Sequence, residues 1–356
     1  MPRTALLPAL LAVLLLAEAA PARAEAETAP WPVRVVVVTM FERGAVRGDD
    51  AGELQHWVER YPLPRELPFP MGEYPLFASE DGVLAICTGG GIANATASIL
   101  ALGTDPRFDL SRAFWLVAGI AGGDPADTTL GSAVWAEHVV DGDLLYELDA
   151  REIPEDWPWG LVPLGVKTPV DDPVDLASGW TLDTIHFPLD PALAAWAYDR
   201  TRELELRDTP AMAAMRARYD GQPAAQRPPS VQRGDTLASG TYWHGERLNA
   251  WANHWVRLYA GPDANFVTTN MEDSGTLTAL HRLGRTGRVD PSRVLVLRTV
   301  SNFSTPPAGE EAAWSSTAPY PDGGAPAIDA AFRVGSEVVR ALAAQWPRSP
   351  VEEGAE

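Results

Sequence analysis

Two stretches in the C-terminal third of the chain place a carboxylate and an amide where a ligand could bind. An apolar segment predicted to be a strand, 266–269, stops just before Glu272, and a helix follows. A second predicted strand, 293–300, ends just before Asn302. Ligands of open α/β sheets bind at the carboxyl ends of strands, so we expect the two strands to be adjacent and to bring both side chains to one edge. A carboxylate that accepts two vicinal hydroxyls, beside an amide that pairs with a base edge, predicts a nucleoside site.

The composition is that of an acidic chain with enough apolar residues for a large core. The chain has 356 residues, of which 46% are hydrophobic, and a formal net charge of −20. Nucleic-acid polymers are bound through basic faces, so this charge argues against them as partners but does not exclude one neutral nucleoside. The histidines show no ligand spacing and no Gly-x-Ser-x-Gly elbow is present, so we expect no metal, no cofactor and no serine hydrolase.

The first 24 residues have the pattern of a secretory signal peptide. Arg3 is followed by an apolar run, 5–17, and by Ala22-Arg23-Ala24. The run is too short to span a bilayer comfortably, and no later run reaches about 18 apolar residues. We therefore expect a mature protein that begins near Glu25, has no membrane span, and is secreted or periplasmic. An uncleaved anchor is the alternative.

A glycine run follows the strand predicted over 83–88. The run, 89–94, leads into a helix predicted over 95–102. A strand, a glycine run and a helix start form a backbone cradle for an anion or a hydroxyl. We expect Gly90, Gly91 and Asn94 to contact the ligand, and a tight turn without a ligand is the alternative.

Further candidate elements come from both ends of the chain. The first predicted strand, 31–39, ends just before Glu42, a candidate functional carboxylate for which a surface loop acid is the alternative. A strand predicted over 114–118 enters a glycine turn at 119–123. The amphipathic segment 327–346 is predicted to be a terminal helix that packs on the sheet.

Five motifs, in order along the chain, resemble those of the nucleoside phosphorylase and nucleosidase superfamily, and within it the purine nucleoside permease family. They are the opening strand with its acidic loop, the glycine-turn strand, the base pocket, the ribose motif and the base motif. Their positions are 33–42, 114–123, 239–243, Asn270-Met271-Glu272 and 298–302. The resemblance covers nearly the whole chain after the signal peptide.

The resemblance implies an α/β fold with three αβα layers around a central mixed, twisted sheet. The domain would span 25–349 and form a homo-oligomer, followed by a disordered tail, 350–356. The proline-rich segment from about 150 to 232 would be an irregular insertion that serves as a cap or an oligomer contact.

The resemblance also implies roles at a purine nucleoside site. Glu272 would bind the ribose hydroxyls, Glu42 would orient or deprotonate the attacking water, and Asn302 would hold the base edge. The other residues expected to contact the substrate are Met271, Trp243, Tyr242, Ser301, Gly90, Gly91, Asn94 and Gly119. The alternatives are that Trp243 and Met271 are core residues and that Glu272 is favoured only by the helix dipole.

Two departures from the family pattern bear on the reaction. Val117 stands where phosphorylases place an arginine that holds phosphate, which favours hydrolysis unless another arginine such as Arg43 reaches in. Asn302 replaces the aspartate that protonates the base, so that proton would come through water or His244. We therefore expect purine nucleoside hydrolysis outside the cytoplasm. A non-catalytic nucleoside-binding protein serving transport and a phosphate-dependent phosphorylase are the alternatives.

Overall fold

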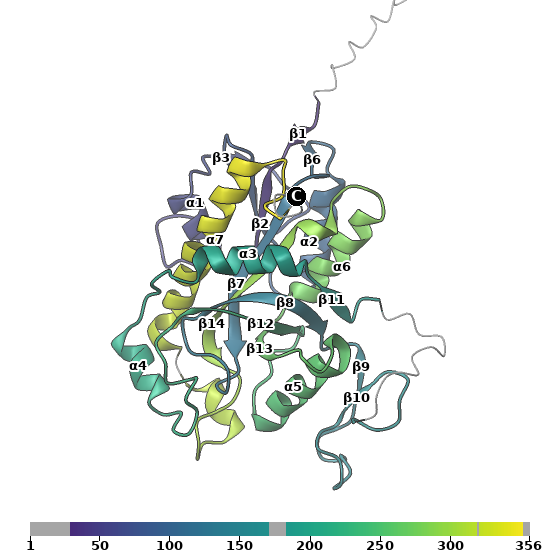
Figure 1. Ribbon diagram of the computed structural model, residues 1–356, viewed down its shortest axis with the longest axis vertical. Helices are drawn as coiled ribbons and strands as arrows, with labels where there is room; N and C mark the ends of the chain where they lie inside the picture. The colour runs from purple at the N-terminus through teal and green to yellow at the C-terminus, as the bar shows by residue number, and fades with distance from the viewer. Residues whose placement is uncertain (1–28, 171–182, 319, 352–356) are drawn as a thin grey trace, which may run out of the picture.

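The structure, a computed structural model, describes residues 29–170, 183–318 and 320–351 (Figure 1). The expected signal peptide and most of the expected tail lie outside these residues. Within the described chain, no helix combines the length and the apolar character needed to cross a membrane.

A mixed sheet of ten strands forms the centre of the described chain. Its strands are β2 (Val35–Thr39), β3 (Arg65–Leu67), β4 (Leu76–Ala78), β5 (Val83–Cys87), β7 (Phe114–Gly123), β8 (Ala133–Asp141), β11 (His186–Pro188), β12 (Val231–Ala238), β13 (Phe266–Asn270) and β14 (Val294–Phe303). The strands β5, β2, β7 and β14 lie side by side and parallel. They are near-continuous apolar runs, as expected of strands covered on both faces.

Five of these strands close into a ring. The pairs β8–β12, β12–β13, β13–β7, β7–β14 and β14–β8 return to their starting strand. As a result β13 and β14 are not adjacent, contrary to the sequence prediction. The end of β7 lies between them, because Gly122 pairs with Thr269 of β13 and with Asn302 of β14. The two strands still deliver their ends to one edge.

The glycine segment 119–123 is strand and not a turn. It continues β7 and pairs with β14 as far as Phe303. The ladders on both sides supply hydrogen bonds that offset the low strand preference of glycine.

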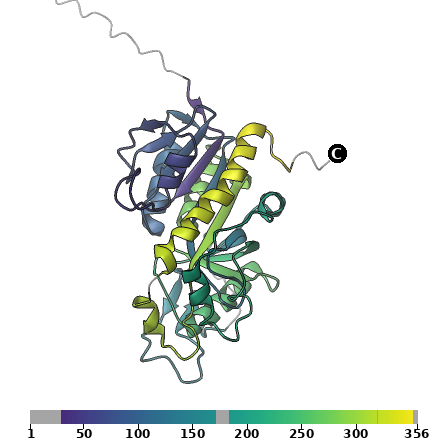
Figure 2. The same cartoon turned by 90° about the vertical axis from the view of Figure 1, so that its left-hand side faces the viewer.

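Helices cover both faces of the sheet, which confirms the predicted three-layer α/β fold (Figures 1 and 2). They are α1 (Gln55–Arg60), α2 (Ile92–Thr104), α3 (Pro191–Thr201), α4 (Pro210–Arg216), α5 (Glu246–Ala260), α6 (Asp273–Gly284) and α7 (Ala325–Gln345). Alternate residues of β2 separate the two cores: Val35 and Val37 pack with α1, α3 and α7, whereas Val36 and Val38 pack with α2 and α6. Trp251 and Trp255 of α5 form a third cluster against β12 and β13.

Two described elements of the segment 150–232 belong to the main fold and not to a peripheral insertion. Its strand β11 extends the sheet by pairing with β8, and α3 packs on α7. The hairpin of β9 (Leu145–Glu147) and β10 (Leu161–Pro163) forms a separate sheet at the periphery (Figure 1). Between 191 and 219 the chain forms two helices, α3 and α4, because Thr209 caps a new helix that starts at Pro210.

Candidate active site

A cavity of about 230 Å³ lies at the carboxyl ends of β7, β13 and β14. Its charged lining residues are Glu53, Glu272 and Arg298. Its uncharged lining residues include Met40, Tyr242, Met271, Ser301, Asn302 and Tyr320. Four of the residues predicted from sequence to contact a ligand, Tyr242, Met271, Ser301 and Asn302, are therefore at this cavity, together with Glu272.

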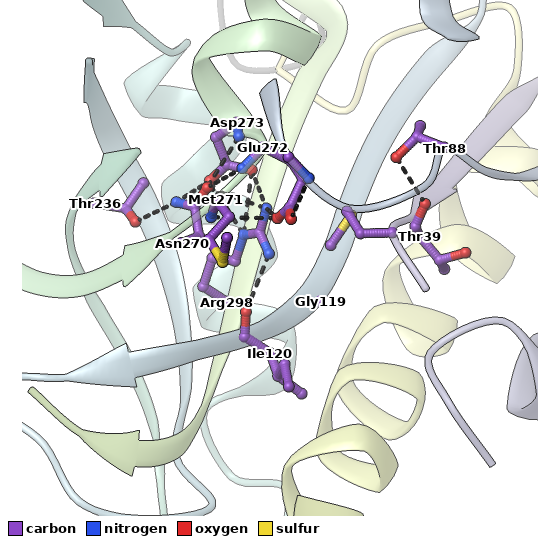
Figure 3. Close-up of polar contacts among 12 residues, drawn as sticks. Thr39, Thr88, Gly119, Ile120, Thr236, Asn270, Met271, Glu272, Asp273 and Arg298 are labelled. Atoms are coloured by element: carbon purple, nitrogen blue, oxygen red, sulfur yellow. Dashed lines mark hydrogen bonds and ion pairs between the residues drawn. The ribbon is translucent and has the colours of Figure 1, made fainter. Parts of the chain in front are cut away.

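Asn270, the last residue of β13, fixes the start of α6. Its Oδ1 accepts hydrogen bonds from the backbone N–H groups of Glu272 (3.1 Å) and Asp273 (2.9 Å). Its Nδ2 donates to Thr236 Oγ1 at 2.9 Å and to Asp273 Oδ2 at 2.7 Å (Figure 3). This buried amide thus uses its donors and its acceptor to hold the helix terminus. Glu272, the N-cap residue, is positioned by that network.

The Glu272 carboxylate is 7% exposed and is held from three sides. Oε1 accepts from the backbone N–H of Gly91 at 3.1 Å. Oε2 accepts from Arg298 Nη2 and from the backbone N–H of Met271, each at 3.3 Å. A carboxylate has about four lone-pair sites, so capacity remains for hydroxyl donors from a ligand. Gly91 therefore supports the carboxylate, which is a different role from the ligand contact predicted for it.

Arg298 is a buried arginine in the middle of β14, and it organises the charges around the cavity. Its Nε donates to Asp273 Oδ2 at 3.1 Å, and its Nη1 donates to the Ile120 carbonyl at 3.0 Å. Its Nη2 also pairs with Asp273, which is 0% exposed (Figure 3). A buried charge persists only when it is paired, so the arginine within 294–300 was the sequence signal for a buried acid nearby.

Glu53 is a cavity carboxylate that the sequence analysis did not single out. Its Oε2 accepts from the backbone N–H of Met40 at 2.8 Å, and its Oε1 accepts from that of Ile120 at 2.7 Å. Burial raises the pKa of Glu53 to about 8, with the Arg298 charge opposing and the Glu272 charge adding to the shift. A carboxyl that titrates near neutral pH inside a cavity is suited to accept or donate a proton.

Glu42 does not line the cavity, although the sequence analysis assigned it the water-activating role. Its Oε1 accepts from the backbone N–H groups of Arg43 (2.8 Å) and Gly52, and its Oε2 accepts from that of Gln55 at 2.5 Å. The side chain thereby closes the loop that precedes α1. The carboxylate that this loop delivers to the cavity is Glu53.

The base-edge candidates form a connected group beside the cavity. Asn302 Nδ2 donates to Tyr242 Oη at 3.1 Å and to the Phe303 carbonyl at 3.2 Å. Ser301 Oγ donates to the Ala121 carbonyl at 3.1 Å and lies 2.9 Å from Asn302 Oδ1. Tyr242 is 50% exposed and lines the cavity, so part of its side chain is accessible to a ligand.

Trp243 lies in the core, the alternative to the substrate contact predicted for it. It is 9% exposed, and its ring packs against Trp251 and Phe266 in the core around α5. It borders a smaller cavity of about 30 Å³ that also contacts Met271 and Tyr242. The aromatic residues that line the main cavity are Phe41, Tyr242 and Tyr320.

Gly90 and Asn94 do not line the main cavity either. Asn94, in the first turn of α2, donates from Nδ2 to the carbonyl of Gly90, which precedes the helix, at 2.8 Å. Gly91 has φ +90°, a value that favours glycine and lets its N–H reach Glu272.

Gly119 lies where three cavity side chains meet. A Cβ at this position would contact the Met40 methyl group and would lie 2.6 Å from Glu53 Oε1 and 2.9 Å from Arg298 Nη1. Gly119→Ala should therefore force these side chains apart and lower the free energy of unfolding by about 1–3 kcal/mol. Urea unfolding measures this loss of stability. Gly90→Ala is the control, because a Cβ on Gly90 meets nothing within 4 Å. Equal stability of the two variants would contradict the packing described.

Known proteins match the chain at the levels of family, sequence and fold. The family model described as "Purine nucleoside permease" matches residues 32–349. A purine nucleoside permease of Candida albicans is 34% identical over 229 residues, which cover 63% of this chain and 55% of that protein. A probable purine nucleoside permease of Schizosaccharomyces pombe is 30% identical over 228 residues, which cover 63% of this chain and 65% of that protein. The chain thus spans about half to two thirds of these relatives.

The solved structures that resemble this one share its fold. A 5′-methylthioadenosine/S-adenosylhomocysteine nucleosidase from Neisseria meningitidis matches with a TM-score of 0.50 at 16% identity, covering 86% of this chain and 99% of that chain. The corresponding nucleosidase from S. pneumoniae matches with a TM-score of 0.51 at 15% identity, covering 88% and 99%. The fold is that of these nucleosidases, and because the family model spans most of its length, the chain belongs to the purine nucleoside permease family.

Proposed function

We propose that this protein hydrolyses the N-glycosidic bond of purine nucleosides. One observation carries the proposal: two buried carboxylates, Glu53 and Glu272, line one cavity that also contains an exposed aromatic ring and an amide. Cleavage of this bond builds positive charge on the ribose and needs a nucleophile on the opposite face of the sugar. With two carboxylates at one cavity, one can stabilise the positive charge on the ribose and the other can activate the nucleophile.

Glu272 is the residue suited to the sugar. Its carboxylate is fixed by Gly91 and Arg298 before any ligand arrives, so it can accept the 2′ and 3′ hydroxyls without reorganisation. A fixed negative charge beside the ribose stabilises the oxocarbenium-like transition state. Met271, the neighbouring lining residue, would pack under the sugar.

Glu53 is the residue suited to the water. In its ionised form the carboxylate takes a proton from the attacking water, whose oxygen bonds to C1′ while the bond from C1′ to the base breaks. Asn302 holds the departing base by hydrogen bonding, but an amide supplies no proton, so the base is protonated from water.

The charges at the cavity favour water over phosphate as the nucleophile. Among the described lining residues Arg298 alone is positive, and its guanidinium is bonded to Asp273, Glu272 and the Ile120 carbonyl. Val117 is apolar and 0% exposed in the core, so it provides no charge or hydrogen bond to a bound phosphate. Arg43 bonds to Asp50 and to the Gly323 carbonyl and does not line the cavity. A phosphate dianion would be left without a free cation.

A second candidate function is nucleoside binding without catalysis. The specific observation in its favour is Asn302, which stands at the base edge and has no proton to give. In this case the protein would capture nucleosides for uptake and release them unchanged.

Incubation with inosine or adenosine, with and without phosphate, tests the proposal. Hydrolysis gives free base and ribose at a steady rate that phosphate does not change. A rate that requires phosphate and yields ribose 1-phosphate would overturn hydrolysis in favour of phosphorolysis. Stoichiometric binding without product would favour the binding protein.

The signal-like pattern in residues 1–24 supports a location for this activity outside the cytoplasm, secreted or periplasmic. There, capture or cleavage of nucleosides would support their uptake. The homo-oligomer implied by the family resemblance stays a prediction.

A further inference from the structure

A further cavity, distinct from the one beside Trp243, adjoins the main cavity at its base-edge residues. The two share Tyr242, Asn302 and Tyr320. The smaller cavity has a volume of about 30 Å³, and apolar side chains such as Phe303 and Trp314 form much of its wall. Among its lining residues is His244. The space therefore begins where Asn302 would hold the base, and it has room for a small group.

His244 has unused hydrogen-bonding capacity. Both ring nitrogens are shielded from solvent, and neither makes a hydrogen bond of ordinary geometry in the described part of the chain, although the Phe303 carbonyl lies close to the ring. Burying a polar group without a partner is costly, so a ligand that supplies one would bind favourably here. The nearby polar groups are already engaged: Tyr219 Oη donates to the Thr305 carbonyl, and Asn302 Nδ2 donates to Tyr242 and to Phe303.

The loop that carries His244 is anchored on both sides. Asp143 holds its start, because Asp143 Oδ1 accepts from Ser239 Oγ at 2.6 Å and Oδ2 accepts from the Gly240 N–H at 2.7 Å. The Gly245 N–H donates to the Ser304 carbonyl at 2.9 Å at its end. The anchored loop fixes the position of the His244 backbone at the cavity before a ligand arrives.

The ring is suited to accept a hydrogen bond. Burial lowers the pKa of His244, and the nearby Phe303 carbonyl opposes that shift, so the ring is neutral at pH 7. A neutral imidazole has one N–H and one acceptor nitrogen. The Phe303 carbonyl is itself an acceptor, so the N–H is favoured on its side and the other nitrogen remains as the acceptor.

We propose that His244 recognises the six-membered ring of the purine by accepting a hydrogen bond from its N1–H or its 6-amino group. The assignment rests on the proposed function, because it takes the base to lie against Tyr242 and Asn302. It makes His244 a specificity residue that distinguishes purines carrying such a donor from those that lack one.

Equilibrium binding of free bases, measured by calorimetry, tests the assignment without requiring turnover. Hypoxanthine has a donor at N1, adenine has one on its 6-amino group, and unsubstituted purine has neither. The wild type should bind the first two about tenfold tighter than the third, as expected for one buried hydrogen bond. His244→Leu should remove that difference, and His244→Gln, which keeps an acceptor, should retain part of it.

His254→Leu is the matched control. His254 also has an unpartnered ring nitrogen, but its ring lies against Trp159 and borders neither cavity. This variant should keep the wild-type preference. A preference that survives in His244→Leu, or an equal loss of affinity for all three bases, would overturn the assignment.

The outcomes also separate the two proposals. One outcome is that the wild type binds the donor-bearing bases more tightly, with His244→Leu removing that difference, and yet releases no base from inosine. This result would support the His244 assignment and contradict hydrolysis. If the wild type binds neither bases nor inosine, the purine site itself is wrong, and both proposals fall.

Discussion

Replacing Glu272 by glutamine is expected to lower kcat at least about a hundredfold, the range seen when a preorganised electrostatic contact is lost. The carboxylate faces the cavity with its charge fixed by Gly91 and Arg298. Glutamine keeps the shape and one acceptor oxygen, so the ground-state contact to the ribose is weakened less than the stabilisation of positive charge in the transition state. Steady-state release of base from inosine should therefore show a larger change in kcat than in KM.

A structural loss can be separated from a catalytic one. Urea unfolding of the Glu272→Gln variant should remain cooperative, because Asp273 continues to pair with Arg298. Glu66→Gln, on the exposed strand β3, is the control and should turn over at the wild-type rate. An unchanged kcat in Glu272→Gln would remove this residue from the site.

Glu53→Gln is expected to lower kcat about a thousandfold, within the range typical of lost general-base catalysis. Glutamine cannot take the proton of the attacking water. Glu42→Gln provides the informative comparison, since its carboxylate bonds to the loop backbone and lies outside the cavity lining. It should lose less than about tenfold. A reversal of this order would restore the assignment made from sequence alone.

The pH dependence of activity follows from the same residue. The ionised form of Glu53 is the base, and burial raises the pKa of its carboxyl to about 8. Turnover by the wild type should therefore rise as the pH increases through about 8 and fall below it. The residual activity of Glu53→Gln should lack this step.

The free energy of unfolding should fall as the pH rises, whereas turnover should increase. Between the ordinary pKa of 4.5 and about 8, the folded protein keeps a proton on Glu53 that the unfolded chain has released. Raising the pH across this interval therefore lowers the free energy of unfolding of the wild type relative to Glu53→Gln. Urea unfolding of both proteins at pH 5 and pH 8 measures this difference.

The parts of the site that sequence predicted are those fixed by local pattern. Met271 and Glu272 follow the end of β13, Asn302 lies near the end of β14, and the structure places each at the cavity. Glu53 was not predicted as a site residue because its position depends on how the loop before α1 folds. That loop folds back on the end of β2, where the Glu53 N–H donates to the Phe41 carbonyl at 3.0 Å. Glu53 thus lies close to Met40 because the loop closes, and no strand pattern in the sequence indicates this contact.

The structure differs from the other sequence predictions where tertiary contacts override local sequence patterns. Consecutive aromatic residues point in different directions, and the pattern alone did not show that Tyr242 faces the cavity while Trp243 packs on α5. The glycines of 119–123 suggested a turn, yet pairing with β14 holds them in a strand. The ring of five strands depends on pairings distant in sequence, such as β8 with β14, that no local pattern encodes.

The most direct test of the account is the number of purine bases that one protein molecule releases from inosine in phosphate-free buffer. The account requires many turnovers per molecule, a rate unchanged by added phosphate, and its loss in Glu53→Gln and Glu272→Gln. Release of no more than one equivalent, or none until phosphate is added, would contradict it.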